Sequence, residues 1–93
     1  MNSSKKDIRA KSSSALDAIG NTPIVKLQKI VPDGYADIYV KLESHNATGS
    51  KKDRMALSMI EGAEKRGDLR SGMTVVEYTG GSTGSGLAFI CAV

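Results

Sequence analysis

The sequence predicts an α/β fold built around a parallel sheet, and three features carry this prediction. A β-branched and aromatic run at 36–43 is followed by an amphipathic helix pattern at 50–66 and then by a largely apolar run at 73–78. A glycine-rich loop at 80–86 leads into a second apolar, helix-like segment at 87–93. Strand, helix, strand, loop and helix in this order are typical of right-handed βαβ units in an α/β domain.

The N-terminal part of the chain predicts short elements joined by turns. Asparagine, proline and glycine mark turns at 21–23 and 32–34, since these residues favour the backbone angles that turns need. β-branched residues next to these turns indicate strands. We therefore expect a short helix at 16–19 that Gly20 ends, and strands at 24–27 and 36–43.

The segment 50–66 is the clearest helix. Ser50 and Asp53 have the spacing of a capping box, in which two side chains satisfy the first N–H groups of a helix. Gly67 follows Lys65 and Arg66 as a C-terminal stop. Helical spacing gathers apolar side chains on one face, namely Met55, Ala56, Met59, Ile60 and Ala63.

Composition argues against several classes of function. The formal net charge of +3 is mild and comes partly from segment 1–14, which we expect to be a flexible tail and not a nucleic-acid arm. We expect no membrane span, because no apolar stretch is long enough. One histidine and one cysteine supply too few ligands for a metal site. Cys91 lies among apolar residues and is predicted to be buried, and a cytoplasmic location fits.

The chain is short for an enzyme and is predicted to be part of a longer domain. Residues 15–93 make at most one small domain, with a core of doubtful independent stability. Val93 lies inside an apolar helix-like run that has no cap. We therefore expect a truncated α/β domain that lacks its C-terminal remainder.

The loop after Tyr78 is the first candidate site. It follows a predicted strand and opens a predicted helix, where free N–H groups and the helix dipole attract anions. Neither the Walker A pattern nor the dinucleotide-binding glycine pattern is present. Thr79, Ser82 and Thr83 add hydroxyl groups, so the loop is either an anion site or a turn used for packing.

The lysine pair Lys51 and Lys52 is the second candidate site. It stands at the start of the predicted helix, and the positive end of a helix dipole favours the neutral, nucleophilic form of an amine. For a lysine pair in general, ordinary solvated residues are the more common interpretation, and the position at a strand-to-helix junction favours a site. The C-terminal ends of parallel strands share one edge of a sheet, so this junction and the loop after Tyr78 are expected to face each other.

Three motifs resemble the cysteine synthase and cystathionine β-synthase family, the fold type II pyridoxal-phosphate enzymes related to the tryptophan synthase β chain. Asn46-Ala47-Thr48-Gly49-Ser50-Lys51-Lys52-Asp53-Arg54 is similar to its lysine motif, Asn-Pro-x-Gly-Ser-x-Lys-Asp-Arg. Gly20-Asn21-Thr22-Pro23 is similar to its opening segment, and Thr79-Gly80-Gly81-Ser82-Thr83-Gly84 to its Thr-Ser-Gly-Asn-Thr-Gly loop. The resemblance implies part of a three-layer αβα parallel-sheet fold.

The resemblance also implies site residues. Lys52 would be the catalytic lysine that holds pyridoxal 5'-phosphate and moves the substrate α-proton. Thr79, Gly80, Gly81, Ser82 and Thr83 would bind the substrate carboxylate, and Ser82 would also contact the cofactor. Gly80 replaces a serine of the family, and Ser82 replaces the asparagine that bonds the cofactor's phenolic oxygen. Asp53 and Arg54 are expected to be structural, and His45 a surface residue.

The function implied is cysteine synthase-like β-replacement on an O-activated serine in cysteine biosynthesis, a lyase or transferase reaction on a small amino acid. The family is typically homodimeric, and its phosphate-binding loop would lie in sequence beyond Val93, so this chain alone is expected to be inactive. Two alternatives stay open. One is a dehydratase or threonine synthase-like eliminase, and the other is a non-catalytic fragment that acts as an interaction module through an exposed sheet edge.

Overall fold

The structure is a computed structural model that describes residues 13–93. The tail expected at 1–14 therefore lies almost wholly outside the described residues. Among the described residues, no helix is both long enough and apolar enough to cross a bilayer.

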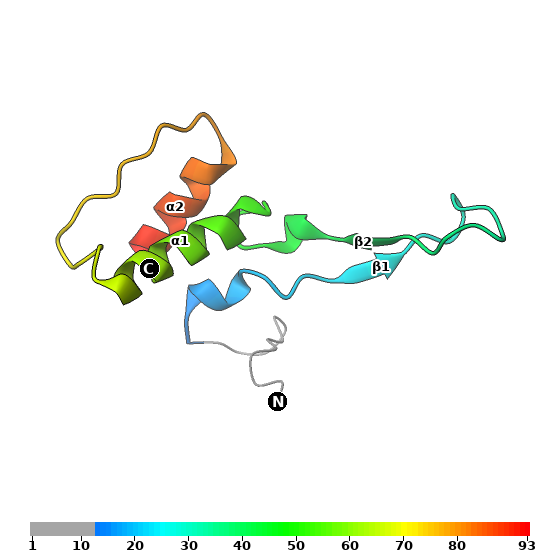
Figure 1. Ribbon diagram of the computed structural model, residues 1–93, viewed down its shortest axis with the longest axis horizontal. Helices are drawn as coiled ribbons and strands as arrows, with labels where there is room; N and C mark the ends of the chain where they lie inside the picture. Colours follow the sequence, from blue (N-terminus) through cyan, green and yellow to red (C-terminus); the bar gives the residue numbers. More distant parts are fainter. Residues whose placement is uncertain (1–12) are drawn as a thin grey trace.

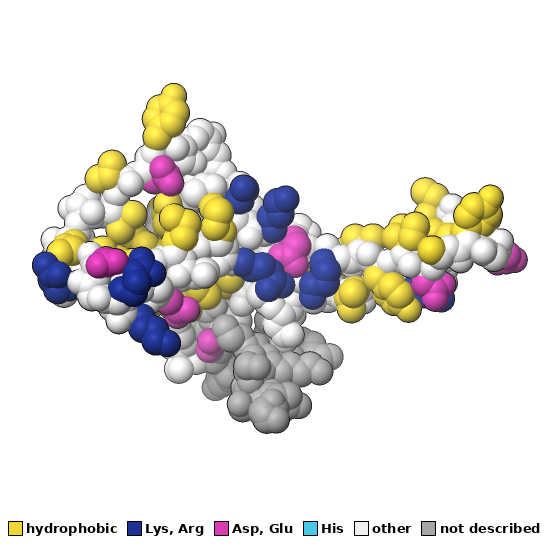
Figure 2. Space-filling view, in the orientation of Figure 1, with side chains coloured by type: hydrophobic (Ala, Val, Ile, Leu, Met, Phe, Trp, Pro, Cys, Tyr) yellow, Lys and Arg dark blue, Asp and Glu magenta, His cyan; other side chains and the backbone are white. Residues whose placement is uncertain are grey.

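Two short strands form an antiparallel ribbon. β1 (Ile24–Lys26) pairs with β2 (Tyr39–Lys41), so that Val25 lies opposite Val40. The ribbon reaches away from the helices and makes the molecule elongated, with a longest dimension of 56 Å (Figure 1). Many of its apolar side chains are exposed, and Figure 2 shows them along the ribbon and at its tip: Ile24, Val25, Ile30, Tyr35, Ile38 and Tyr39.

Two helices form the body of the molecule. α1 (Lys52–Arg66) and α2 (Ser82–Ala92) pack side by side (Figure 1). Gly67 ends α1 as predicted, with a left-handed backbone (φ +82°) and an N–H that bonds the carbonyls of Ala63 and Glu64. Two 3₁₀ turns, η1 (Ala15–Ala18) and η2 (Glu43–His45), precede the helices along the chain.

The core lies where η1, α1 and α2 meet. Its buried members are Ile19, Ala56, Leu87 and Ile90, and Leu16, Leu57, Ile60 and Phe89 pack around them. The face predicted for α1 is therefore only partly buried, since Met55 and Met59 are 39% and 49% exposed. The core contact of α1 runs through Ala56, Leu57 and Ile60.

The predicted strand at 73–78 is not formed. These residues belong to the connection between α1 and α2, which arcs away from both helices (Figure 1). Val76 and Tyr78 are almost fully exposed there. A strand needs a neighbour to satisfy its N–H and C=O groups, and within residues 13–93 this segment pairs with none. The sheet of the described residues is accordingly antiparallel and not the parallel sheet that the βαβ order predicts.

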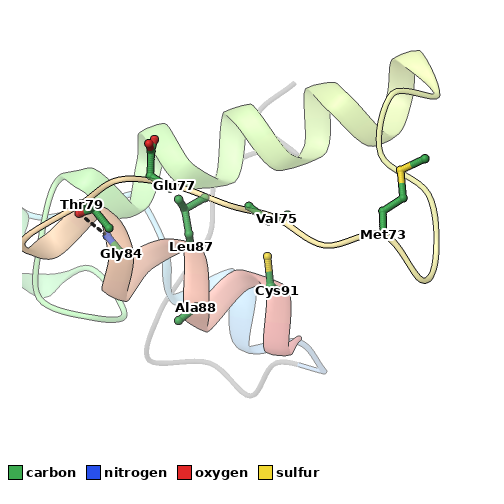
Figure 3. Close-up of a pocket in the computed structure, with 8 residues that line it drawn as sticks. All are labelled: Met73, Val75, Glu77, Thr79, Gly84, Leu87, Ala88 and Cys91. Atoms are coloured by element: carbon green, nitrogen blue, oxygen red, sulfur yellow. Dashed lines mark hydrogen bonds between the residues drawn. The ribbon is translucent and has the colours of Figure 1, made fainter.

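Two further predictions near α2 are wrong. The helix begins at Ser82 and not at Leu87, because the glycine-rich segment continues into the helix, where Gly86 packs closely on α1. Cys91 is exposed and not buried, because it faces the connection that stands off from α2 (Figure 3).

Candidate active site

Lys52 is the first residue of α1, and the turn before it is tightly built. Gly49 has a left-handed backbone (φ +87°) that favours glycine, and its N–H bonds the carbonyl of Asn46 at 2.8 Å. The Ser50 hydroxyl oxygen accepts a bond from the Lys52 N–H at 3.0 Å. Lys52 is half-buried, whereas Lys51 is exposed. The two lysines therefore stand in different surroundings although they are neighbours in sequence.

Asp53 is fully buried directly after Lys52. Its carboxylate accepts bonds from the N–H of Thr48, at 2.7 Å, and from the Thr48 hydroxyl. The capping box expected between Ser50 and Asp53 is not formed, because the Ser50 hydroxyl bonds the Lys52 N–H and the Asp53 carboxylate turns to Thr48 instead. Its structural role is confirmed, since these bonds tie the turn at 46–49 to α1.

The start of α1 lies against Gly86, in the second turn of α2. A Cβ added at Gly86 would stand 3.0 Å from Oδ1 of Asp53 and 3.4 Å from Cβ of Ala56. The lysine-bearing first turn of α1 therefore neighbours the first half of α2. This geometry links the two segments singled out in the sequence through direct helix contact.

Thr79 caps the first turn of α2. Its hydroxyl oxygen accepts bonds from the N–H groups of Gly81, at 3.3 Å, and Gly84, at 3.2 Å. Gly80, Gly81 and Ser82 are exposed, and Thr83 is half-buried. A Cβ added at Gly80 or Gly81 would meet no atom within 4 Å, so this part of the loop is open to a ligand.

A polar cluster beside α1 was not predicted from sequence as a unit. The Arg54 guanidinium binds the Glu43 carboxylate through two bonds, Nε to Oε1 at 2.7 Å and Nη2 to Oε2 at 3.2 Å. Thr22 donates its hydroxyl to Glu43, and Asn46 donates Nδ2 to Oε1 at 2.9 Å. The expected salt-bridge role of Arg54 is confirmed, and the signal that could have revealed the cluster is Thr22 within Gly20-Asn21-Thr22-Pro23.

This cluster shifts the acid–base behaviour of its charged members. The Arg54 hydrogen bonds, followed by those of Thr22 and Asn46, lower the pKa of Glu43 from 4.5 to about 2. The hydrogen bonds to Glu43 raise the pKa of Arg54 above its usual value. Glu43 is therefore a carboxylate over the whole physiological pH range.

A cavity of about 310 Å³ lies between α2 and the connection before it. Figure 3 shows Met73, Val75, Glu77 and Thr79 on one side and Gly84, Leu87, Ala88 and Cys91 on the other. Lys52 is not among its lining residues. His45, in η2, is exposed as expected for a surface histidine. The cavity therefore adjoins the Thr79 loop but not the lysine.

Comparisons with known proteins define the class. Residues 15–93 match the family described as "Pyridoxal-phosphate dependent enzyme". The chain belongs to this family, whose members use pyridoxal 5'-phosphate.

Curated relatives indicate which members of this family the chain resembles. A cysteine synthase from Staphylococcus aureus is 60% identical over 74 residues, which are 80% of this chain and 24% of that protein. Cysteine synthase B from Salmonella typhimurium is 56% identical over 75 residues, which are 81% of this chain and 25% of that protein. The chain is thus a cysteine synthase-like member of the family, and it spans about a quarter of the length of these relatives.

Solved structures agree with the sequence relatives. The fold is similar to O-ureido-L-serine synthase, with a TM-score of 0.80 and 48% identity over 89% of this chain and 26% of that one. It is also similar to O-acetyl serine sulfhydrylase isoform 3 from Entamoeba histolytica, with a TM-score of 0.81 and 35% identity over 94% of this chain and 27% of that one. These matches confirm the predicted fold class, a part of the fold type II arrangement.

The residues present fit two chemical needs of this cofactor and its substrates. Lys52, a half-buried residue, offers a primary amine for an aldehyde. The open Gly80–Gly81 surface leads into the first turn of α2, whose N–H groups suit a carboxylate or phosphate.

Proposed function

We propose that this chain contributes the cofactor lysine and the substrate-carboxylate loop of a cysteine synthase-like enzyme, which replaces the β-substituent of an O-activated serine. The observation that supports it best is the contact between Asp53, the neighbour of Lys52, and Gly86 in α2. This contact brings the lysine-bearing turn beside the helix that the Thr79 loop opens. The names and identities of the relatives support the same reaction.

Lys52 is the catalytic residue in this proposal. Its amine would hold the cofactor through the aldehyde. Once free, the same amine would accept the substrate α-proton as a general base. When bound, pyridoxal phosphate supplies the electron sink that this proton removal requires.

The loop at 79–83 binds the substrate carboxylate in this proposal. The Thr79 hydroxyl oxygen already accepts two N–H bonds, so its hydrogen is free to point at the substrate. The N–H groups of Ser82 and Thr83 stand in the first turn of α2, where the helix itself supplies no acceptor. Gly80 and Gly81 let the carboxylate approach the backbone, and Ser82 also contacts the cofactor.

We also infer the wider setting of the site. Residues 15–93 would form the N-terminal part of the enzyme domain, in a cytoplasmic homodimer that acts on a small amino acid. The match over 15–93 and the names of the relatives support this inference.

A chimeric enzyme tests the proposal. Residues 15–93 replace the matched segment of the S. aureus cysteine synthase, and cysteine formation from O-acetylserine and sulfide is measured. We expect cysteine to be formed by the chimera and lost in its Lys52→Ala variant, with Lys51→Ala as the matched control. The 93-residue chain assayed alone is expected to be inactive.

Two results would contradict the proposal. A folded, dimeric chimera that binds the cofactor but forms a keto acid instead of cysteine would indicate an eliminase. A chimera that keeps its activity in Lys52→Ala would remove the lysine from the mechanism.

A further inference from the structure

Four polar residues from three segments meet beside the first turn of α1, and we call them the Arg54 cluster: Thr22, Glu43, Asn46 and Arg54. Thr22 and Asn46 are 5% and 4% exposed. Each oxygen of the Glu43 carboxylate accepts two bonds, Oε1 from Arg54 and Asn46, and Oε2 from Arg54 and Thr22. The cluster is therefore a network in which both oxygens of the Glu43 carboxylate are bonded twice.

The backbone around the cluster is shaped to hold it. The Asn46 side chain also bonds backbone groups, accepting from the Gly20 N–H at 2.7 Å and donating to the Glu43 carbonyl at 2.8 Å. Gly20 has a left-handed backbone (φ +82°), and a Cβ there would stand 3.3 Å from Nη1 of Arg54. The chain thus places a glycine where the guanidinium needs room.

We infer that the Arg54 cluster positions Lys52. Arg54 lies in the same helical turn as Lys52, and its guanidinium is bonded to both Glu43 and Thr22. A two-bond contact between a planar guanidinium and a carboxylate resists sliding as well as rotation, so it fixes how the start of α1 is turned. The importance of that orientation rests on the proposed function, in which the Lys52 amine must reach an aldehyde.

The start of α1 has anchors on two sides. Asp53 holds it to Thr48 and lies against Gly86, while Arg54 holds it to the segments at 20–23 and 43–46. Lys52 directly precedes Asp53 and lies two residues before Arg54. Lys51, one residue earlier, is exposed and would compete with Lys52 for any reagent that modifies amines. By fixing the orientation of α1, the cluster makes Lys52 the half-buried residue and leaves Lys51 exposed.

Lysine acetylation of the whole 93-residue chain tests this inference without the cofactor. A small acetylating reagent is used in limiting amount, and peptide mass spectrometry gives the modification rates of Lys51 and Lys52. In the unaltered chain we expect Lys52 to react about fivefold more slowly than Lys51, because it is half-buried. In Arg54→Lys and in Glu43→Gln the ratio is expected to move toward one.

Arg66→Lys is the matched control, because Arg66 makes an exposed ion pair with Asp68 (3.0 Å) at the other end of α1. It should leave the ratio unchanged. Equal rates in the unaltered chain, or a ratio that Arg54→Lys and Glu43→Gln do not alter, would overturn the inference. Loss of the helical circular dichroism signal in both variants would also overturn it, since the cluster would then support the whole fold and not one amine.

A parallel sample of the S. aureus chimera, treated with pyridoxal phosphate and borohydride, separates this inference from the proposed function. If acetylation changes as expected and the chimera is trapped mainly at Lys52, both are supported. If acetylation changes but no trapping occurs at Lys52, the proposed function fails and the positioning of the amine stands.

Discussion

Gly86 in α2 lies against the buried carboxylate of Asp53 in α1, so closely that a Cβ at position 86 would stand 3.0 Å from Oδ1. Asp53 is wholly buried and is itself bonded to Thr48. The contact joins the turn that carries Lys52 to the helix that follows the Thr79 loop. It explains why a glycine occupies a helix interior, where it otherwise costs stability.

Gly86→Ala should destabilise the fold despite its better helix propensity. Crowding of Asp53 and Ala56 is expected to cost about 1–3 kcal/mol, against a gain of about 1 kcal/mol from alanine in a helix. The free energy of unfolding in urea measures the balance. Gly62→Ala in α1 is the control, because its Cβ would meet only the movable end of Arg66, at 3.2 Å. Gly62→Ala should be neutral or stabilising. If Gly86→Ala and Gly62→Ala change the free energy of unfolding equally, the close contact at Gly86 is refuted.

Glu43→Gln should reveal a pH-dependent loss of stability. The pKa of Glu43 is lowered to about 2 in the folded chain against 4.5 for the free group, so the ionised carboxylate stabilises the fold above about pH 4.5. This contribution is lost as the pH falls from 4.5 toward 2. Across that pH range, the difference in the free energy of unfolding between the unaltered chain and Glu43→Gln should shrink toward zero. The control Glu61→Gln, at an exposed position, should not change the free energy of unfolding at any of these pH values. A difference for Glu43→Gln that persists at low pH would contradict the stabilising role of the ionised Glu43 carboxylate.

Thr79→Val should loosen the start of α2. The change keeps the shape of the side chain but removes the oxygen that accepts from Gly81 and Gly84, at an expected cost of about 1 kcal/mol. Hydrogen exchange of the Gly84 amide should become faster by roughly fivefold. Thr74→Val, at an exposed position in the connection, makes the same chemical change and should leave that amide unaffected. Unchanged exchange in Thr79→Val would show that Thr79 is not a cap.

The helix α1 and its C-terminal end were predictable because their signals are local. Gly67 acts on its own backbone neighbours and ends the helix as predicted, whereas the helix begins at Lys52, two residues after the predicted start. Local chemistry decides such features without help from the rest of the fold.

The strand at 73–78 and the Arg54 cluster were not predictable in the same way, since both depend on distant partners. An apolar run such as Met73–Tyr78 becomes a strand only where another strand pairs with it, and within residues 13–93 none does. Arg54 and Thr22 are 32 positions apart, so no periodicity joins them. Cys91 was misjudged for a related reason, because its exposure depends on where the connection runs.

The most direct test of the central claim is the visible absorption of the S. aureus chimera with pyridoxal phosphate, compared between two variants that each lose one lysine. We predict an absorption band from the lysine-bound cofactor that persists in Lys51→Ala and vanishes in Lys52→Ala. A band that survives Lys52→Ala and disappears in Lys51→Ala would contradict the account, because the Lys52 amine would then not be the one that holds the cofactor.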